Sequence, residues 1–597
     1  MRWIEGEATG TQAQGEADRL AARLGLRPAV GRALWARGLR DVESAQRFLE
    51  PTLASLPDPF GLKGIEAAVS RMQRALESRE AVCVNGDYDV DGVTSTALLV
   101  SILRKFAARA PGPAGPAKID FYVPHRLVEG YGLNTAALEK LAAKGARLLV
   151  SADCGVTAVS EIDAAARVGL DVVVIDHHTA AQTSEGLPRA VAILNPHQPG
   201  CTFPGRELAA VGVTFHLLLA LRKRLREAGW FQKAPEPNLR EALDLVALGT
   251  VADVVPLTGP NRVLVHFGLR ELALGARVGV LALKSVAGLS GPVTAGDVGF
   301  KLGPRINAAG RLDDASVGVR LLLSTDPQEA RRLAEQLDRA NQERQELQQK
   351  ISVEAIARAE ELGSPEQRRS LVVSAAGWHV GVVGIVASRL VERFHRPAVV
   401  LAEDGGTSKG SARSVEGFHL YDSLAACSGH LQKFGGHKHA AGMTLATSEI
   451  PAFAAALEEQ ARARLTPEQL TPKVRIDARL APEELDLALA KQLQKLAPFG
   501  AGNPEPVFSC EGLAVTDAKL ISDKKGTGPG HLKLRLAAES HQDDGRGQGK
   551  AVDAIGFGFG SRDLAAGALL GAAFQLGVDT WSGVEKVQLK LKDVRPA

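Results

Sequence analysis

Over residues 62–255, short apolar runs of β-type residues alternate with longer segments that have a helical pattern. Regular alternation of this kind is typical of a doubly wound, largely parallel sheet in an α/β protein. Two of the helical segments are expected at 205–228 and 238–251. The strands are expected in five runs, namely AVCVNG (81–86), KIDFYVP (118–124), ARLLVSAD (146–153), LDVVVIDHH (170–178) and AVAILNP (190–196).

A long amphipathic helix is predicted from Asp326-Pro327 to about Leu362, with apolar residues at near-heptad spacing and charged residues on the other faces. About 36 helical residues span roughly 50 Å, which suits a connector between two bodies. A two-stranded coiled coil between chains is the alternative explanation of this apolar seam. The seam consists of Leu333, Leu337, Ala340, Leu347 and Ile351.

The rest of the chain divides by pattern into a helical start, a second α/β unit and a β-rich end. Short strands separated by polar loops after residue 472 predict a small β-barrel or sandwich. By period-2 alternation, half of the aromatic residues Phe557, Phe559, Phe574 and Trp581 should face its core. The expected segments are a helical lead-in (1–60), a first α/β domain (61–325), a connector helix (326–363), a second α/β lobe (364–468) and the β domain (469–597).

Composition narrows the class of protein. A chain of 597 residues is too long for one core, and its 45% apolar and 23% charged residues are ordinary for a folded soluble protein. The net charge of +3 does not indicate a nucleic-acid partner by itself, because an acidic cluster would offset local positive charge. Five scattered cysteines predict reduced thiols and a cytoplasmic protein. The N-terminus lacks the apolar region of a signal peptide, and 371–388 fits a strand–turn–helix better than a membrane span.

Three aspartates, Asp87, Asp89 and Asp91, alternate directly after the first apolar run. In an extended chain, alternate side chains point to the same face, and three carboxylates there repel one another unless a cation lies between them. The carboxyl end of a strand that leads into a helix is also where open α/β sheets hold ligands. An aspartate-rich turn is the alternative.

Further carboxylates and imidazoles follow other predicted strands and one helix. Asp153 ends the third run, Asp176-His177-His178 ends the fourth, and Asp253 follows the helix at 238–251. An oxygen-rich set with one or two imidazoles suits Mn²⁺ or Mg²⁺. Two such ions about 3.5–4 Å apart clamp a phosphoryl group during hydrolysis. A nicotinamide enzyme is excluded, because the first strand leads into aspartates and not into a glycine-rich phosphate loop.

From about residue 60 to its end, the chain resembles the RecJ exonucleases of the DHH phosphoesterase superfamily, and the ordered set of motifs is specific. The motifs are GDYDVDG (86–92), ADCG (152–155), DHH (176–178), GTVADVVPL (249–257), GPRINAAGRL (303–312), GWHVGVVGIVASRLVERFHRP (377–397), GSARSVEGFHL (410–420), FGGHKHAAGMTL (434–445) and FGAGNPEPVF (499–508). The resemblance implies a DHH catalytic domain, a DHHA1-like substrate-binding lobe at 364–468 and a C-terminal OB-fold that binds DNA.

The resemblance also implies roles around two ions. Asp89 and Asp91 would each serve one metal, and Asp153 would bridge the pair. Where many relatives have a histidine, Asn85 stands here, so Asp87 is expected to help bind the first metal.

His177 and Asp253 would complete the coordination of the second ion, and His178 would face the scissile phosphate; an inert, packed His178 is the alternative. Asp176 would orient His177 or the neighbouring ligands. Catalytic roles are thus expected for Asp89, Asp91, Asp153, His177, His178 and Asp253.

For the DNA strand, the resemblance points to glycines that admit a backbone and to cations that bind phosphate. Ser411 and Arg413 suit a terminal phosphate. A surface salt bridge is the alternative for any one arginine. The expected DNA-binding residues are Arg126, Arg305, Asn307, Arg311, Ser411, Arg413, Gly435, Gly436 and His437.

The resemblance therefore implies a 5′-to-3′ exonuclease that releases mononucleotides from single-stranded DNA in repair and recombination. The alternatives are a DHH phosphodiesterase acting on short RNA or cyclic dinucleotides, and a non-catalytic replication scaffold. A monomer is expected, with a single-strand-binding protein and a helicase as further partners and no membrane association. The sequence does not separate Mn²⁺ from Mg²⁺.

Overall fold

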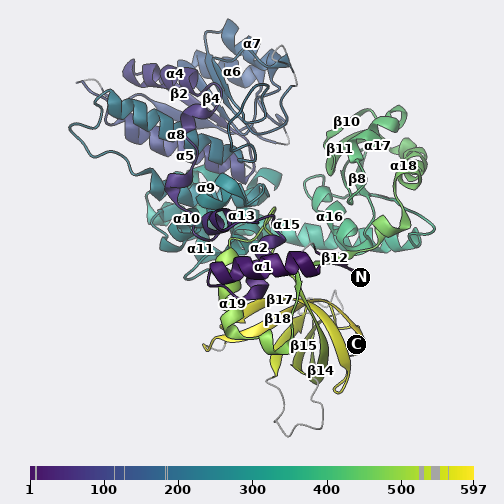
Figure 1. Ribbon diagram of the computed structural model, residues 1–597. Coiled ribbons are helices and arrows are strands. Elements are labelled where there is room, and N and C mark those ends of the chain that lie inside the picture. The colour runs from purple at the N-terminus through teal and green to yellow at the C-terminus, as the bar shows by residue number, and fades with distance from the viewer. Residues whose placement is uncertain are drawn as a thin grey trace. The chain divides into compact units, whose positions relative to one another are not determined.

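The computed structural model describes residues 1–6, 10–112, 115–126, 128–181, 183, 186–312, 314–522, 530–538, 551–562, 564–581 and 583–596. The chain forms two compact units that interleave along the sequence (Figure 1). Unit 1 contains 1–51, 465–499 and 503–597, and unit 2 contains 52–464 with 500–502.

Unit 2 is built on a five-stranded sheet in which every neighbouring pair is parallel. Its spatial order is β3-β2-β4-β5-β6, so the chain winds to one side of β2 first and then crosses to the other side. The point between β2 and β4 is therefore the switch point of the fold. The strands are β2 (Ala81–Gly86), β3 (Ile119–Tyr122), β4 (Ala146–Ala152), β5 (Asp171–Ile175) and β6 (Ala192–Leu194).

Both faces of this sheet are buried, which explains why its strands are continuously apolar. On β4, Leu148 and Val150 enter the large core with α4, α5 and α8, while Leu149 enters a second core with α6 and α7. The predicted α/β class with a doubly wound parallel sheet is thereby confirmed. These helices are α4 (Ile65–Glu77), α5 (Val90–Ala107), α6 (Thr135–Ala143), α7 (Val159–Arg167) and α8 (Ala210–Glu227).

A helical layer follows the sheet and completes the large core. It includes a π-helical turn at Val298–Leu302, directly before α13. The helices are α9 (Leu243–Ala252), α10 (Gly259–Leu274), α11 (Val278–Val286), α12 (Ala295–Asp297), α13 (Gly303–Leu312) and α14 (Ser316–Leu323).

The predicted long helix is α15 (Pro327–Glu361), whose first turn is capped by the Asp326 carboxylate accepting from the Gln328 N–H. Leu333 and Leu337 belong to the core of the parallel sheet, whereas Ile351 belongs to the core of the second lobe. The apolar seam of α15 therefore packs into two different cores of the same chain.

The second lobe holds a mixed sheet of order β10-β11-β9-β8-β7, in which only β7 and β8 pair in parallel. Its strands are β7 (Leu371–Ala376), β8 (Ala398–Asp404), β9 (Thr407–Arg413), β10 (Lys433–Gly436) and β11 (Ala440–Ala446). Its helices are α16 (Val383–Phe394), α17 (Leu420–Ala426) and α18 (Ile450–Arg464).

Unit 1 contains a closed β-barrel, because β14 pairs with β15 on one side and with β17 on the other. Phe559 and Phe574 are buried in it, whereas Phe557 and Trp581 are 60% and 94% exposed. This division matches the predicted one. The elements are β12 (Lys473–Ile476), β13 (Ala478–Arg479), α19 (Leu487–Leu493), β14 (Phe508–Ile521), β15 (His531–Ala538), β16 (Val552–Gly556), β17 (Leu569–Asp579) and β18 (Lys586–Pro596).

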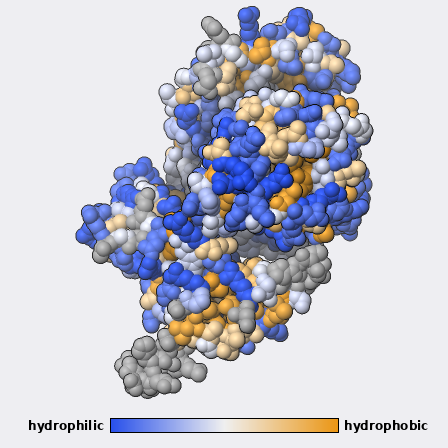
Figure 2. Space-filling model, turned by 90° about the vertical axis from the view of Figure 1, so that its right-hand side faces the viewer, coloured by the Kyte–Doolittle hydropathy of each residue, from blue (hydrophilic) through white to orange (hydrophobic). Residues whose placement is uncertain are grey.

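The N-terminal residues pack on this barrel. β1 (Arg2–Glu5) pairs in parallel with β12, and α1 (Thr11–Arg23), α2 (Pro28–Trp35) and α3 (Val42–Leu49) contribute to the barrel core. Figure 2 shows mostly hydrophilic side chains on one face of the molecule, with smaller apolar areas between them. In the described part of the chain, no helix is long and apolar enough to cross a membrane.

Candidate active site

The acidic residues gather at the carboxyl ends of the parallel strands. Asp87 follows β2, Asp153 follows β4 and Asp176 follows β5, so the first two flank the switch point. Asp253 reaches the same place from the C-terminal end of α9. The fold therefore explains why residues more than 160 positions apart meet there.

Backbone N–H groups at helix starts fix two of the aspartates. Asp89 caps α5, and its Oδ1 accepts from the N–H groups of Asp91 and Gly92 at 2.9 and 3.1 Å. The Asp91 carboxylate accepts from the first two N–H groups of α8, those of Ala210 and Val211, at 2.7 and 2.9 Å. Unpaired N–H groups and the helix dipole stabilise negative charge at such positions.

Asp153 adopts a left-handed backbone conformation, with φ of 65°, which is uncommon for a residue other than glycine. Its N–H donates to the Ile175 carbonyl, and its own carbonyl accepts from the Tyr131 hydroxyl at 3.1 Å. Both ends of its peptide unit are therefore held, which offsets the strain of this conformation.

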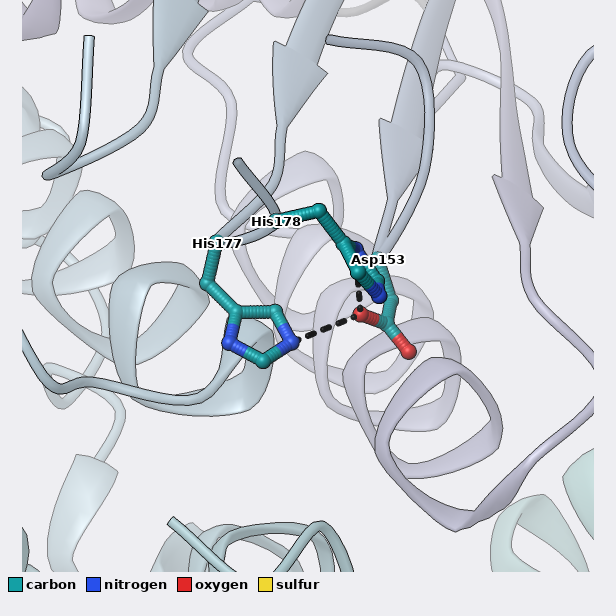
Figure 3. Close-up of side chains that lie close together, drawn as sticks. All are labelled: Asp153, His177 and His178. Carbon is teal, nitrogen blue, oxygen red and sulfur yellow. Dashed lines mark ion pairs between the residues drawn. The ribbon is translucent and has the colours of Figure 1, made fainter. Parts of the chain in front are cut away.

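Both imidazoles of the His177-His178 pair point toward one oxygen of Asp153 (Figure 3). His177 Nε2 lies 3.3 Å from Asp153 Oδ1 and 3.5 Å from Asp253 Oδ2. His178 Nδ1 lies 3.8 Å from Asp153 Oδ1 and 2.8 Å from Asp176 Oδ1. Asp176 also accepts from the N–H groups of both histidines, so it holds the ring of His178 and only the backbone of His177.

Buried polar atoms without partners converge in this cavity. Among the described residues, Asp87 Oδ1, Asp153 Oδ1, Asp253 Oδ2 and His177 Nε2 are buried and make no hydrogen bond. Leaving such groups unpaired is costly, and divalent cations bound between them would satisfy them. Three sets of ligand atoms lie close enough to share an ion: Asp87-Asp89-Asp153, Asp91-His177-Asp253 and Asp153-His177-His178.

The crowding of carboxylates shifts their pKa values upward. Burial, followed by the charge of Asp89, raises the pKa of Asp91 to about 7. Burial and the neighbouring aspartates raise the pKa of Asp253 to about 9, and that of Asp153 well above its usual value. Burial dominates the rise for Asp87 as well. A bound cation would counter this repulsion and restore the ionised forms.

The two histidines shift in opposite directions. Burial and the neighbouring His178 lower the pKa of His177 to about 4, which leaves it neutral and fit for metal ligation. For His178, burial acts in the same direction, but the hydrogen bond and charge of Asp176 outweigh it and raise the pKa to about 9. His177 therefore offers a neutral nitrogen that can bind a metal ion, and His178 offers a positive charge.

A pocket of about 370 Å³ opens beside the carboxylates, and cations line its other side. The Arg126 guanidinium stacks on the Tyr88 ring at 4.8 Å, and Arg311 donates to the Gly381 carbonyl at 3.1 Å. Asn307 accepts from the Val90 N–H. The described lining residues are Asp87, Tyr88, Asp89, Arg126, Tyr131, His178, Ala252, Asp253, Asn307, Gly310 and Arg311.

Ser411 and Arg413 lie on the same side of β9, at the start of α16. A Cβ atom at Gly384, the second residue of α16, would lie 3.2 Å from Arg413 Nη2 and 3.3 Å from Ser411 Oγ. A helix N-terminus, a hydroxyl and a guanidinium together suit a terminal phosphate.

Four other predicted DNA-binding residues lie elsewhere. Arg305 pairs with Asp338 of α15 at 2.9 Å and donates to the Lys301 carbonyl, and it is not among the described pocket residues. Gly435 and Gly436 belong to the edge strand β10, and His437 follows it; none of the three is among those pocket residues.

Two tyrosines of the pocket were not predicted. Tyr131 donates to the Asp153 carbonyl and its hydroxyl lies 3.4 Å from His178 Nδ1. Tyr88 packs edge-on against Tyr131 and supports Arg126. The available signal was the placement of Tyr88 between Asp87 and Asp89 and of Tyr131 between two glycines.

Comparison with known families defines the class first. The model of the DHH family, N-terminal domain, matches residues 81–250, and that of the DHHA1 domain matches 368–463. Fold and site therefore define a phosphoesterase-type DHH sheet followed by a DHHA1 domain. The model of the RecJ OB domain matches 476–593.

Individual relatives then narrow the class. The single-stranded-DNA-specific exonuclease RecJ of Dickeya dadantii is 40% identical over 95% of this chain and 96% of its own length. The crystal structure of RecJ from Thermus thermophilus in complex with Mn²⁺ matches with a TM-score of 0.80 and 31% identity, over 100% of this chain and 80% of that one. Its complex with Mg²⁺ matches with a TM-score of 0.75 and 30% identity, over 100% and 78%. The chain belongs to the RecJ family of single-stranded-DNA-specific exonucleases.

Proposed function

We propose that this protein is a single-strand-specific DNA exonuclease that removes mononucleotides from the 5′ end, in DNA repair and recombination. The observation that carries the proposal is the cavity in which unpartnered atoms of Asp87, Asp153, His177 and Asp253 meet beside a pocket lined by arginines. Carboxylates for cations and guanidinium groups for phosphates are the two halves of a phosphodiester-hydrolysing site. Membership of the RecJ family supports the choice of DNA as substrate.

The proposed cofactors are two Mn²⁺ or Mg²⁺ ions, which when bound activate water and stabilise the leaving oxygen. Asp87 and Asp89 would hold one ion, and Asp153 would be shared by both.

Asp91, His177 and Asp253 would hold the other ion. His178, kept protonated by Asp176, would donate to the scissile phosphate. Asp176 itself would act as a positioning residue, through its hydrogen bonds to the His178 ring and to the Val156 N–H.

The 5′ polarity would come from the site formed by Ser411, Arg413 and the start of α16. If a 5′-terminal phosphate occupied that site, Arg126, Arg311 and Asn307 would lie along the first nucleotides leading to the carboxylates. The polarity itself is supported by the family resemblance.

A monomer is proposed, with single-stranded DNA as the main partner and a single-strand-binding protein and a helicase as further partners. The cytoplasm is the proposed location, in keeping with the free thiols of all five cysteines.

End-labelled oligonucleotides test the proposal. A 5′-labelled single strand incubated with Mn²⁺ should yield labelled mononucleotide from the first time point, whereas a 3′-labelled strand should yield a ladder of shortening products. EDTA should abolish both, and a blunt duplex should resist. Immediate release of a 3′ label as mononucleotide would show the opposite polarity. Cleavage of the duplex at the same rate as the single strand would contradict the strand preference.

A further inference from the structure

Arg344, in the middle of α15, is a buried cation without a counter-ion. It is 9% exposed, on a helix that packs against α11, α13, α14 and α16. Its Nη1 donates to Gln348 Oε1 at 2.6 Å and its Nη2 to Asn341 Oδ1 at 2.9 Å, while its Nε is buried and has no partner. In the described part of the chain, no carboxylate lies within ion-pairing distance of it.

This arrangement is unusual for a buried arginine, because burying a charge is costly unless an opposite charge accompanies it. Arg71 shows the ordinary solution in the same protein. It is 5% exposed, and it pairs with Asp171 at 2.5 Å and with Glu80 at 2.6 Å. Arg344 has two neutral amides where Arg71 has two carboxylates.

The helix of Arg344 packs against α13, which carries Arg311, so the uncompensated charge of Arg344 lies next to the arginines of the pocket. Burial and then the charges of Arg126, Arg344 and Arg413 lower the pKa of Arg311 to about 10. None of these four residues makes an ion pair with a carboxylate within the described residues. We call Arg126, Arg311, Arg344 and Arg413 the arginine cluster.

We propose that Asn341 and Gln348 form a neutral clamp that holds Arg344 without cancelling its charge, and that this charge strengthens the hold of the arginine cluster on the phosphates of a DNA strand. Arg344 thus acts through the other arginines of the cluster, since Nη1 and Nη2 each donate to a clamp amide and Nε is buried. A carboxylate at either clamp position would hold the side chain equally well but would neutralise it. The inference rests on the proposed function, because it presumes a polyanionic strand in the pocket.

Gln348→Glu tests the clamp with an almost isosteric change. The variant should bind a 5′-phosphorylated single strand roughly three- to tenfold more weakly at low salt in EDTA, measured by fluorescence anisotropy. The slope of log K against log salt should shrink, but by less than about 0.7, the value for one lost phosphate contact on a single strand, because Arg344 itself touches no phosphate. The unfolding temperature should not fall, because an ion pair replaces the hydrogen bond between the buried guanidinium and a neutral amide.

Gln345→Glu is the matched control, since it adds the same charge on the exposed side of the same helix. Arg344→Lys and Arg344→Gln give a second comparison, in which the lysine should keep the salt slope and the glutamine should lose it.

Equal slopes for Gln348→Glu and Gln345→Glu would overturn the inference, as would equal losses in Arg344→Lys and Arg344→Gln. A purely structural Arg344 would lower the unfolding temperature and leave the slope unchanged. If the unsubstituted protein neither bound nor cleaved single strands, the proposed function would fail and this inference with it.

Discussion

Asp153 meets three demands at once: a left-handed backbone, a carbonyl that accepts from Tyr131, and a carboxylate between both imidazoles. Asparagine tolerates the left-handed region well and has the same shape as aspartate. The charge of this side chain can therefore be removed without disturbing its backbone.

Asp153→Asn should lower turnover roughly a thousandfold or more, because the carboxylate shared by both proposed ions is lost. Binding of single-stranded DNA in EDTA should persist. Asp153→Ala should be as inactive and, in addition, less stable than Asp153→Asn by about 1 kcal/mol, because alanine is strained at this φ. Single-turnover rates, anisotropy and thermal unfolding measure the three effects; a fast Asp153→Asn would contradict the bridging role.

Metal affinity should increase with pH, since the ligands must lose protons before they bind a cation. With the pKa of Asp91 at about 7 and that of Asp253 at about 9, each ligand proton contributes about tenfold in affinity per pH unit below its pKa. Calorimetric titration of Mn²⁺ at pH 6.5, 7.5 and 8.5, in buffers of different ionisation enthalpy, should show proton release. No dependence on pH would contradict these shifts.

The same pKa values set the stability of the metal-free protein. Because the folded-state pKa of Asp91 lies above its unfolded value, its contribution is complete at low pH and is lost as the pH rises through about 7. In EDTA the unfolding temperature should therefore fall from about pH 4 to pH 7 through Asp91, and on to about pH 9 through Asp253, and Mn²⁺ should restore it.

Arg413 and Arg305 were predicted alike from the sequence, but the structure gives them different surroundings. Arg413→Ala should weaken binding of 5′-phosphorylated strands about 10- to 100-fold relative to 5′-hydroxyl strands, as expected for a lost charge-assisted contact. Arg305→Ala should leave that ratio unchanged and lower stability, because Arg305 pairs with Asp338. Competition binding with both strand types measures the ratio.

At this scale the sequence placed the acidic residues correctly at the strand ends, because these ends are local patterns. The extended alternation expected for Asp87, Asp89 and Asp91 is wrong, because α5 begins at Val90 and Asp91 is already helical. It could not separate Arg305 from Arg311, since both lie in one motif six residues apart on the same helix. Their difference depends on Asp338, which lies on another helix.

Among the elements, α16 carries the proposed phosphate site at its start. Gly384 provides the room that Ser411 and Arg413 occupy, at a position where alanine favours the helix. Gly384→Ala should leave the unfolding temperature within a few degrees but reduce the preference for 5′-phosphorylated ends. Arg413→Ala should remove that preference both in the unsubstituted protein and in the Gly384→Ala variant. If Gly384→Ala alone left the preference unchanged, the terminal phosphate would bind elsewhere.

Elements with a regular apolar pattern were predicted most reliably. The five parallel strands and α15 follow from their apolar patterns, whereas β14 was not singled out, because Gly512 and Asp517 interrupt its alternation. The polar residues Asn341, Arg344 and Gln348 are buried on α15, although their chemistry predicts exposure. They continue the heptad spacing of Leu337 and Ile351, so the period places them on the buried side of α15 although their side-chain chemistry does not predict it.

For the whole molecule, the sequence predicted residues 1–60 as a separate lead-in, and the division into five segments stays a prediction. In the structure, Leu20, Val30 and Leu34 share a core with the barrel. An amphipathic pattern shows that a helix has a buried face, but it does not identify a partner more than 400 residues away.

The boundaries of unit 2 suggest a truncation that tests the role of the barrel. A fragment of residues 52–464 should fold and cleave short strands, but should bind long single strands more weakly than the full chain, since it lacks the barrel. A fragment of residues 1–464 should aggregate, because its N-terminal helices lose their apolar partner. Gel filtration compares the aggregation of the two fragments, and anisotropy with strands of increasing length compares fragment 52–464 with the full chain. Equal binding of long strands by these two would contradict a DNA-binding role for the barrel.

The pairing of β1 with β12 joins Arg2 to Lys473, and this has a consequence during synthesis. At about 5–20 residues per second, the ribosome needs roughly half a minute or more to reach the partner of the first strand. Unit 2 can fold during this time. The apolar sides of α1, α2 and α3 stay exposed until the barrel is synthesised. Nascent chains stalled before residue 465 should thus recruit chaperones through their first fifty residues.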